Sequence, residues 1–148
     1  MHLFMRKLNT IVRCGNIYRA EQLQNEELGG HYHGFVLAIS KNPGLSQDQL
    51  AQRLCFNKST VARSLAHLEA HGYVTRTSSA NDRRVTLVYP TDKMLAVYPS
   101  IREIAVEWNR LLAEGIEEEH IKIFMSVLDR MDARAKELVA DGNGGQRE

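Results

Sequence analysis

The most constraining feature of this sequence is a pair of short helix signals separated only by Cys55 and Phe56. The first signal starts at Ser46, an N-cap residue that is followed three positions later by the glutamine of a capping box. The second starts at Asn57, another favoured N-cap residue. Because two short helices joined by so tight a turn have to cross steeply, the pattern predicts a helix-turn-helix over residues 46–71.

A β-hairpin is predicted directly after the second of these helices. Gly72 is expected to end the helix, and the runs YVTRT and RVTLVY that follow alternate apolar and polar residues, as half-buried strands do. The turn SSANDRR between the runs carries Arg83 and Arg84, and Asp82 can orient one of them through a charge-assisted hydrogen bond. The sequence therefore predicts a basic wing over residues 73–90.

Amphipathic helices flank this central region on both sides. Apolar residues spaced three and four apart predict a first helix that ends at the glycine pair after Leu28, and a largely apolar second helix precedes the helix-turn-helix. Two long helices are expected after the wing, so the predicted fold class is mainly α with a small β-hairpin wing. The expected organisation is an N-terminal helix over 1–28, a winged helix-turn-helix over 29–91, C-terminal helices over 92–140 and a flexible tail over 141–148.

Charge and composition narrow the class of protein. The 148 residues have a net charge of +1, but residues 57–84 carry a net charge of +3 and the run EGIEEE at 114–119 is acidic. No apolar run reaches the length of about eighteen residues that a membrane span needs, and basic residues interrupt the N-terminus, so no secretory signal is expected. Two cysteines without a CxxC motif argue against a disulfide framework. We therefore expect a cytoplasmic protein.

The helix-turn-helix and the wing together predict contacts with two adjacent grooves of DNA. In such a motif the second helix enters the major groove, and its N-terminal residues face base edges. Arg63 suits bidentate binding of guanine, whereas the hydroxyls of Ser59 and Thr60 suit phosphates or bases. The arginines of the wing suit the neighbouring minor groove. The exposed face of the helix is expected to present Lys58, Ser59, Ala62, Arg63 and His67.

The run NKSTVARSLAHLEAHGYVTRTSSANDRRVTLVYPTD resembles the winged helix of the MarR family of bacterial transcription regulators. The similarity includes the helix end LEAHGYVTR and a wing motif D-x-R at Asp82 and Arg84, and helix order and length agree across nearly the whole chain. The resemblance implies a homodimer held by the first helix and the last two, a pseudo-palindromic operator in double-stranded DNA, and release by a small ligand or by oxidation. The expected DNA contacts are Ser46, Gln47, Lys58, Ser59, Thr60, Arg63, Asp82, Arg83 and Arg84.

The resemblance also suggests candidate residues for a regulatory signal. Tyr32 or His33 is expected to line a pocket where the family binds phenolic anions, although packing explains Tyr32 equally well. Cys14 resembles the sensing cysteine of the family's peroxide-responsive branch, but a buried packing residue is the favoured interpretation. From its place in the turn, Cys55 is expected to be a small apolar filler, and Arg76 is expected to support the strand.

The sequence is less consistent with function classes other than DNA binding. A winged helix can also serve as a protein-interaction module that does not read DNA, because fold alone does not determine function. The sequence has no Ser-His-Asp order and no nucleotide-binding loop, so we do not expect an enzyme or a cofactor. The histidines lack ligand spacing, so no metal site is predicted. The sequence therefore favours a DNA-binding transcription regulator, most simply a repressor released by an effector.

Overall fold

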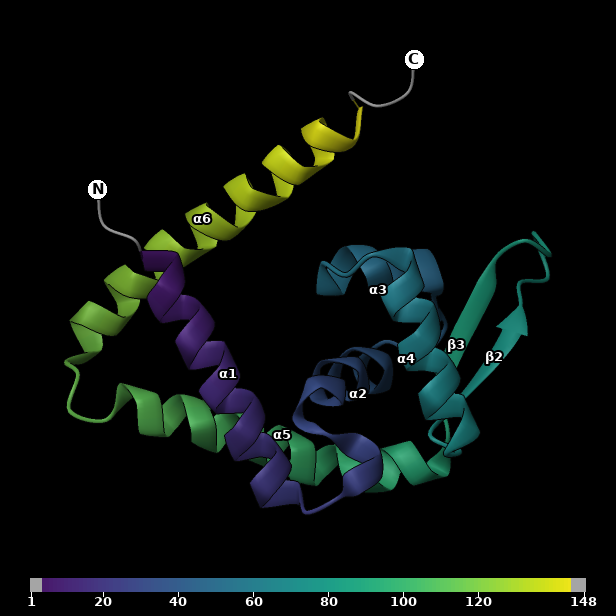
Figure 1. Ribbon diagram of the computed structural model, residues 1–148, viewed down its shortest axis with the longest axis horizontal. Helices are drawn as coiled ribbons and strands as arrows, with labels where there is room; N and C mark the ends of the chain where they lie inside the picture. The colour runs from purple at the N-terminus through teal and green to yellow at the C-terminus, as the bar shows by residue number, and fades with distance from the viewer. Residues whose placement is uncertain (1–3, 145–148) are drawn as a thin grey trace. The chain divides into compact units, whose positions relative to one another are not determined.

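The computed structural model describes residues 4–144, which form two compact units that divide after Trp108 (Figure 1). The mainly helical architecture with one small sheet confirms the predicted fold class. The first unit contains α1 Phe4–Leu23, the 3₁₀ turns η1 Glu26–Leu28 and η2 Gly30–Tyr32, α2 His33–Lys41, α3 Gln47–Leu54, α4 Lys58–Ala70, the strands of the wing, and most of α5 Asp92–Ala113. The second contains the end of α5 and α6 Glu118–Gly144.

The helix-turn-helix forms as its caps predict. The hydroxyl of Ser46 accepts a hydrogen bond from the N–H of Gln49, and the side chain of Gln49 accepts one in return from the N–H of Ser46. At the start of α4, the side chain of Asn57 accepts a hydrogen bond of 2.7 Å from the N–H of Thr60. Each cap satisfies N–H groups that the first turn of a helix leaves unpaired, so the local sequence alone explains where both helices begin.

The turn between α3 and α4 differs from the prediction at Cys55. This residue has φ 53° and an exposed side chain, so the expectation of an apolar filler is wrong. Cys55 instead ends α3 in the left-handed conformation that glycine usually supplies at this position. The apolar contact of the turn is made by Phe56, whose ring stacks on Phe35 with centroids 5.7 Å apart.

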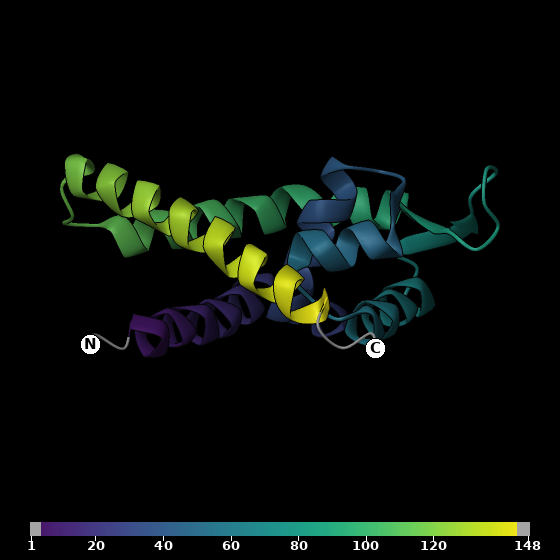
Figure 2. The same cartoon turned by 90° about the horizontal axis from the view of Figure 1, so that it is seen from above.

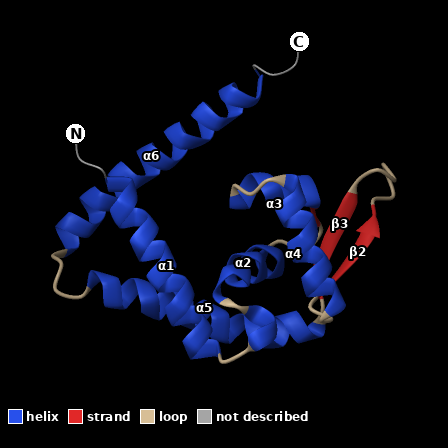
Figure 3. Ribbon diagram, in the orientation of Figure 1, coloured by secondary structure: helices blue, strands red, loops and turns tan. Residues whose placement is uncertain are grey.

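The wing belongs to a small antiparallel sheet whose strand order is β1-β3-β2. Figure 3 shows β2 and β3 side by side. Its strands are β1 Leu45–Ser46, β2 Val74–Ser78 and β3 Thr86–Pro90. The pair β2 and β3 confirms the predicted hairpin, and its register places Val74 opposite Pro90. The sequence does not predict β1, because a strand of two residues is too short to show alternation. It pairs Leu45 with Val88 and so connects the start of the helix-turn-helix to the wing.

The core of the first unit lies among α2, α3, α4, the sheet and the first half of α5. Ala51 is 7% exposed and supplies the small residue needed where α3 and α4 cross. A well-packed core of this kind resists deformation, so it fixes α4 relative to the wing. The side chains that are at most 1% exposed include Leu28, Phe35, Val36, Ile39, Leu50, Val61, Leu65, Leu68, Val88, Met94 and Ile101.

The first helix ends earlier than predicted. α1 ends at Leu23, and Gln24 adopts φ 48°, which turns the chain into η1 and η2 before α2 begins. The glycine pair that was expected to stop the helix has a different role. A Cβ atom at Gly30 would overlap the carbonyl oxygen of Asn16, so η2 packs directly against the backbone of α1. Only glycine permits this close approach.

The last helix is longer than predicted. α6 continues to Gly144, although a tail was expected from residue 141; residues 145–148 of that tail lie outside the described residues. No helix within the described range 4–144 is long and apolar enough to cross a lipid bilayer. Exposed apolar side chains recur along α6 at Ile123, Phe124, Met125, Val127, Leu138 and Val139. Such a helix needs a partner surface to cover these side chains.

Candidate nucleic-acid interface

The N-terminal half of α4 presents most of its predicted contact residues to solvent. Lys58, Ser59 and Arg63 are exposed, and nothing within the described residues pairs with the guanidinium of Arg63. The hydroxyl of Ser59 donates to the capping asparagine at 2.8 Å, and Thr60 lies half buried beside it. Lys58 forms an exposed ion pair of 3.1 Å with Asp48 of α3. Because such surface pairs are weak, Lys58 can exchange Asp48 for a phosphate.

The wing carries two arginines at the tip of the hairpin, which extends away from the helices of the first unit (Figure 2). The carboxylate of Asp82 accepts two hydrogen bonds of 3.2 Å from the guanidinium of Arg84. These hydrogen bonds hold the pKa of the Asp82 carboxyl below its ordinary value. The side chain of Arg84 is nevertheless 90% exposed, and Arg83 is exposed beside it. The expected orienting hydrogen bond is therefore present.

Arg76 joins the wing to both helices of the helix-turn-helix. Its Nε and Nη2 donate to the carboxylate of Glu69 at 3.0 and 2.6 Å, and its Nη1 donates to the side-chain oxygen of Gln47 at 3.3 Å. Hydrogen bonding from Arg76 lowers the pKa of the Glu69 carboxyl. This arrangement confirms the predicted support role of Arg76. Two expected DNA contacts therefore already have hydrogen-bond partners within the chain. Gln47 accepts from Arg76, and Ser46 belongs to the capping box of α3.

His67 does not lie on the exposed face of α4, contrary to the sequence-based expectation. Its ring stacks on Tyr32, with ring centroids 4.5 Å apart and ring planes 3° from parallel. Its Nε2 lies 2.7 Å from the carbonyl oxygen of Glu27. A carbonyl oxygen only accepts, so Nε2 carries the proton and donates. The expectation was wrong because helical spacing does not show that η1 and η2 cover this side of α4.

A second polar cluster lies between α1 and α2. His33 is 2% exposed, and no described residue forms a hydrogen bond with either of its ring nitrogens. Burial, with a further contribution from the positive charge of Arg19, lowers the pKa of His33 to about 4. The Nε of Arg19 is also buried without a partner, while its Nη2 donates to Asn16 at 2.6 Å. Buried polar groups rarely lack partners, so the cluster has capacity to bind a ligand.

Aromatic rings border this polar cluster. A Cβ atom at Gly15 would lie 3.0 Å from Nε1 of Trp108 and 3.1 Å from Nη1 of Arg19, so the indole and the guanidinium both pack against α1 there. Tyr18 packs on Trp108 with centroids 5.1 Å apart. Tyr32, which was expected in a pocket here, stacks on α4 instead. The expected effector pocket did not include Arg19 or Trp108. Gly15 could have indicated them, because a glycine inside a helix often marks a place where another segment packs closely.

The cysteines and the described histidines form no further assembled site. Cys14 is exposed on α1, so the favoured interpretation of a packing residue buried within its own chain is wrong. The outer face of an amphipathic helix points away from the core of its own unit, which explains this exposure. No group of three or more His, Cys, Asp and Glu side chains in the described part of the chain is arranged to hold a metal ion.

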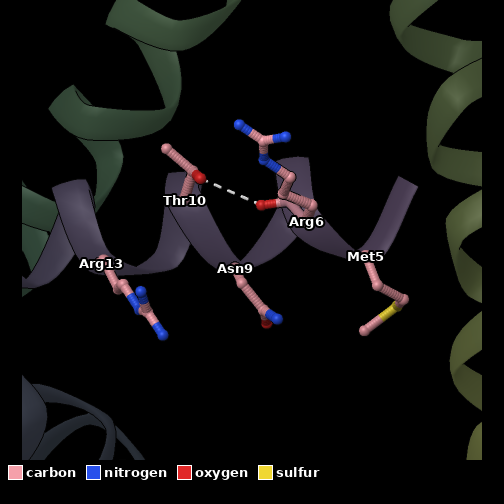
Figure 4. A pocket seen from close by; sticks show the side chains of 5 residues that line it. All are labelled: Met5, Arg6, Asn9, Thr10 and Arg13. Carbon is pink, nitrogen blue, oxygen red and sulfur yellow. Dashed lines mark hydrogen bonds between the residues drawn. The ribbon is translucent and has the colours of Figure 1, made fainter. Parts of the chain in front are cut away.

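An open pocket runs along the N-terminal half of α1 (Figure 4). The hydroxyl of Thr10 donates to the backbone carbonyl of Arg6 at 3.0 Å within it. Its lining comes from one face of a single helix and includes none of the predicted site residues, so it is not the expected effector pocket. The lining residues are Met5, Arg6, Asn9, Thr10 and Arg13.

The helix α4 and most of the wing lie within the part of the chain that matches a known family. Residues 28–85 match the model of the MarR family. The chain is 23% identical to the HTH-type transcriptional regulator YybA of Bacillus subtilis (strain 168) over 146 residues, which cover 97% of each protein. The similarity therefore extends beyond the winged helix to the flanking helices.

Solved structures share the same fold over most of the chain. The crystal structure of the transcriptional regulator SlyA matches with a TM-score of 0.85 and 25% identity, covering 92% of this chain and 96% of that one. A MarR family transcriptional regulator from Listeria monocytogenes, solved with 26mer DNA, matches with a TM-score of 0.90 and 20% identity, covering 100% and 99% of the two chains. The central part of this chain, residues 28–85, therefore matches the MarR family, and the chain as a whole is similar to transcription regulators of that fold.

Proposed function

We propose that the protein binds specific DNA sequences, with α4 in the major groove and the wing in the neighbouring minor groove. The observation that carries this proposal is the pairing of Asp82 with Arg84, which holds a guanidinium at the wing tip and leaves it exposed. A cation held in place loses less conformational freedom on binding than a mobile one. Narrow minor grooves attract arginine side chains. The DNA complex of the Listeria monocytogenes regulator, which has the same fold, supports this use of the fold.

Each predicted contact then has a distinct role. Arg63, exposed and without a partner in the described residues, reads a base edge. Lys58 gives up its exposed pair with Asp48 to bind a phosphate. The hydroxyls of Ser46, Ser59 and Thr60, the amide of Gln47 and the wing residues Asp82, Arg83 and Arg84 complete the proposed interface.

The regulator acts as a homodimer held by α1, the end of α5 and α6. These helices expose large apolar side chains that a single chain leaves uncovered, and patches of this kind mark protein interfaces. A two-fold dimer would place its two α4 helices roughly 34 Å apart, which matches one turn of DNA and requires a pseudo-palindromic operator. The exposed residues include Phe4, Met5, Ile11, Val12 and Ile17 on α1, and Leu111, Leu112, Ile116, Phe124 and Val127 on α5, α6 and the connection between them.

Release from DNA is caused by a small aromatic anion that binds at Arg19 and His33. The buried Nε of Arg19 and both ring nitrogens of His33 lack partners in the described chain. A carboxylate or phenolate would accept hydrogen bonds from the Nε–H of Arg19 and from the one N–H that a neutral imidazole carries. The rings of Trp108 and Tyr18 lie on the same side of α1 and suit the aromatic part of such a ligand. In the cytoplasm, the dimer would repress by occupying a promoter until this effector binds.

A second proposal concerns oxidation, and the exposure of Cys14 favours it. An accessible thiol on a dimer-forming helix can be oxidised and can thereby change the packing of that helix. On this account Cys14→Ser would bind DNA like the wild type but would no longer release it in the presence of peroxide. Release by peroxide that is unchanged in Cys14→Ser would exclude this role.

Selection from a pool of random duplexes tests the proposed DNA reading. The wild-type protein should enrich one pseudo-palindromic sequence, and Arg63→Ala should lose selectivity at one base pair in each half-site. Arg102→Ala is the matched control, because it removes the same charge from an exposed position on α5. A folded wild-type protein that enriches no sequence would instead support a protein-interaction module.

A further inference from the structure

We propose that η2, residues 30–32, is a strut that transmits effector binding from α1 to the DNA-reading helix α4, with Tyr32 and His67 as its positioning residues. This inference rests on the proposed function and concerns the regulation of the same effector site. η2 has one contact with the helix that carries Arg19 and another with the helix that carries Arg63. It therefore lies between the two sites that regulation has to connect.

The first contact of the strut is with α1. A Cβ atom at Gly30 would overlap the backbone carbonyl of Asn16, so no side chain separates the two backbones. The side chain of the same Asn16 accepts a hydrogen bond of 2.6 Å from Nη2 of Arg19. An anion that binds the Nε of Arg19 would shift the same guanidinium whose Nη2 donates to Asn16. A shift of α1 at Asn16 is then passed to η2, because a direct backbone contact has no flexible side chain to absorb it.

The second contact of the strut is a cluster of four rings that reaches α4 and contains one stacked pair. Tyr32 lies on His67 with centroids 4.5 Å apart and planes 3° from parallel. The ring of His31 lies 3.9 Å from that of Tyr32, and the ring of His71 lies 4.2 Å from that of His67, both pairs with tilted planes. Two of the rings therefore belong to η2, one belongs to α4, and the fourth belongs to the residue that caps the end of α4. Close ring packing of this kind couples the positions of the two segments.

Hydrogen bonds hold two rings of this cluster, those of His67 and His71, in place. His67 donates from Nε2 to the carbonyl of Glu27 at 2.7 Å, and His71 donates from Nδ1 to the carbonyl of His67 at 2.8 Å. The carboxylate of Glu27 accepts hydrogen bonds from the hydroxyl of Tyr73 at 2.9 Å and from Lys93 at 2.8 Å. The turn before η2 is thus anchored to the base of the wing and to α5. Because this segment is anchored, η2 cannot move independently of its neighbours. A displacement of η2 would therefore also displace the ring of His67.

The position of His67 on α4 makes this contact relevant to DNA binding. His67 follows Arg63 by one helical turn, so the two side chains lie one above the other on the helix. A changed ring contact at His67 would tilt or shift the segment that carries Arg63. Such a change would alter the spacing between the two α4 helices of the proposed dimer.

The first experiment measures how strongly a small anion and DNA oppose each other. Benzoate is the probe, and its binding is followed by the fluorescence of Trp108, the single tryptophan of the chain. DNA binding is followed by the anisotropy of a labelled duplex selected by the wild-type protein. Benzoate should weaken DNA binding by the wild type about tenfold, within the usual range of allosteric coupling. Tyr32→Leu and His67→Leu should bind benzoate within about twofold of the wild type but lose most of this weakening.

Two variants control for a merely structural effect. Tyr32→Phe keeps the ring, and the hydroxyl of Tyr32 forms no hydrogen bond to any described residue, so this variant should respond like the wild type. Phe56→Leu removes a different stacked ring of the helix-turn-helix and should also keep the response. If benzoate weakens DNA binding by Tyr32→Leu as much as it weakens binding by the wild type, the proposed role of η2 is wrong.

A second experiment tests, without a small ligand, whether η2 is coupled to α4. If benzoate changes neither the fluorescence of Trp108 nor DNA binding by the wild type, the proposed effector class is wrong, and hydrogen exchange then tests the strut. Coupling between two sites is reciprocal, so DNA bound at α4 should slow amide exchange in peptides covering residues 28–36. The wild type and Tyr32→Phe should show this slowing and Tyr32→Leu should not. Exchange that DNA leaves unchanged in the wild type would refute the inference.

Discussion

Asp82 and Arg84 are joined at the tip of the wing by two hydrogen bonds of 3.2 Å between the carboxylate and the guanidinium. A third hydrogen bond of 3.0 Å, from the N–H of Arg84 to the same carboxylate, closes the turn. Arg83 has no side-chain partner among the described residues. Two neighbouring arginines therefore differ in how far the protein orients them before DNA arrives.

This difference predicts unequal effects of two alanine substitutions. Arg84→Ala should weaken binding to the selected duplex by about 1–3 kcal/mol, because it removes an oriented contact. Arg83→Ala should cost less, because a mobile side chain contributes mainly its charge. The dissociation constants of both variants, measured by anisotropy, check this. Equal losses for the two variants would show that the hydrogen bonds from Arg84 to Asp82 have no role in DNA binding.

Arg63 and Lys58, the two exposed basic residues of α4, should differ in how their loss affects sequence preference. Arg63→Ala should lower the preference for one base pair by about 1–3 kcal/mol, because Arg63 is proposed to read a base. Lys58→Ala should weaken binding to all sequences about equally and should reduce the salt slope by about one, because Lys58 is proposed to bind phosphate. Binding to the selected duplex and to single-base variants of it, at several salt concentrations, separates these outcomes. Loss of base preference in Lys58→Ala would contradict the assignment.

His33 should make the fold sensitive to mild acid. Its folded pKa is about 4, below the ordinary value of 6.5, so the unfolded state binds more protons between these pH values. The free energy of unfolding should therefore lose about 3 kcal/mol from this group as the pH falls from 6.5 to 4, and no more below that. His33→Gln cannot titrate and should lack this loss. Urea unfolding of both proteins at pH 7, 5.5 and 4 measures the difference, which should be absent if His33 is accessible to protons in the folded state.

The left-handed residue at the end of α3 offers a test of the turn. Cys55 has φ 53°, a conformation that glycine adopts without steric cost. Cys55→Gly should therefore raise the free energy of unfolding by about 0.5–1 kcal/mol, after allowance for the greater freedom of glycine in the unfolded chain. Cys55→Ala keeps the Cβ atom and is the matched control. Thermal or urea unfolding that shows no advantage of glycine over alanine would contradict this account of the turn.

The elements that the sequence predicted best are those with local causes. The starts of α3 and α4 follow from Ser46 and Asn57, whose side chains bond N–H groups within the same turn. The hairpin follows from alternation along its own strands. The end of α1 at Leu23 could not be predicted, because Gln24 adopts a left-handed conformation for which its residue type gives no signal.

The candidate functional residues that the sequence did not predict are buried by segments that lie far from them along the chain. Arg19 and His33 form a polar cluster only because Gly30 lets η2 approach α1 and turns the chain into α2. His67 looked exposed because nothing in α4 itself shows that Tyr32 covers it. Tertiary contacts of this kind decide which polar side chains are buried, and a single sequence does not contain them.

The salt dependence of DNA binding by the wild-type protein tests the central claim most directly. A dimer that applies two recognition helices and two wings to a duplex contacts many phosphates, so binding should release counterions. With about six phosphate contacts, the affinity for the selected duplex should fall about a thousandfold between 50 and 200 mM salt. Tight binding that weakens in this way would support the proposed interface. A folded dimer that fails to bind DNA at 50 mM salt, or that binds with little salt dependence, would contradict it.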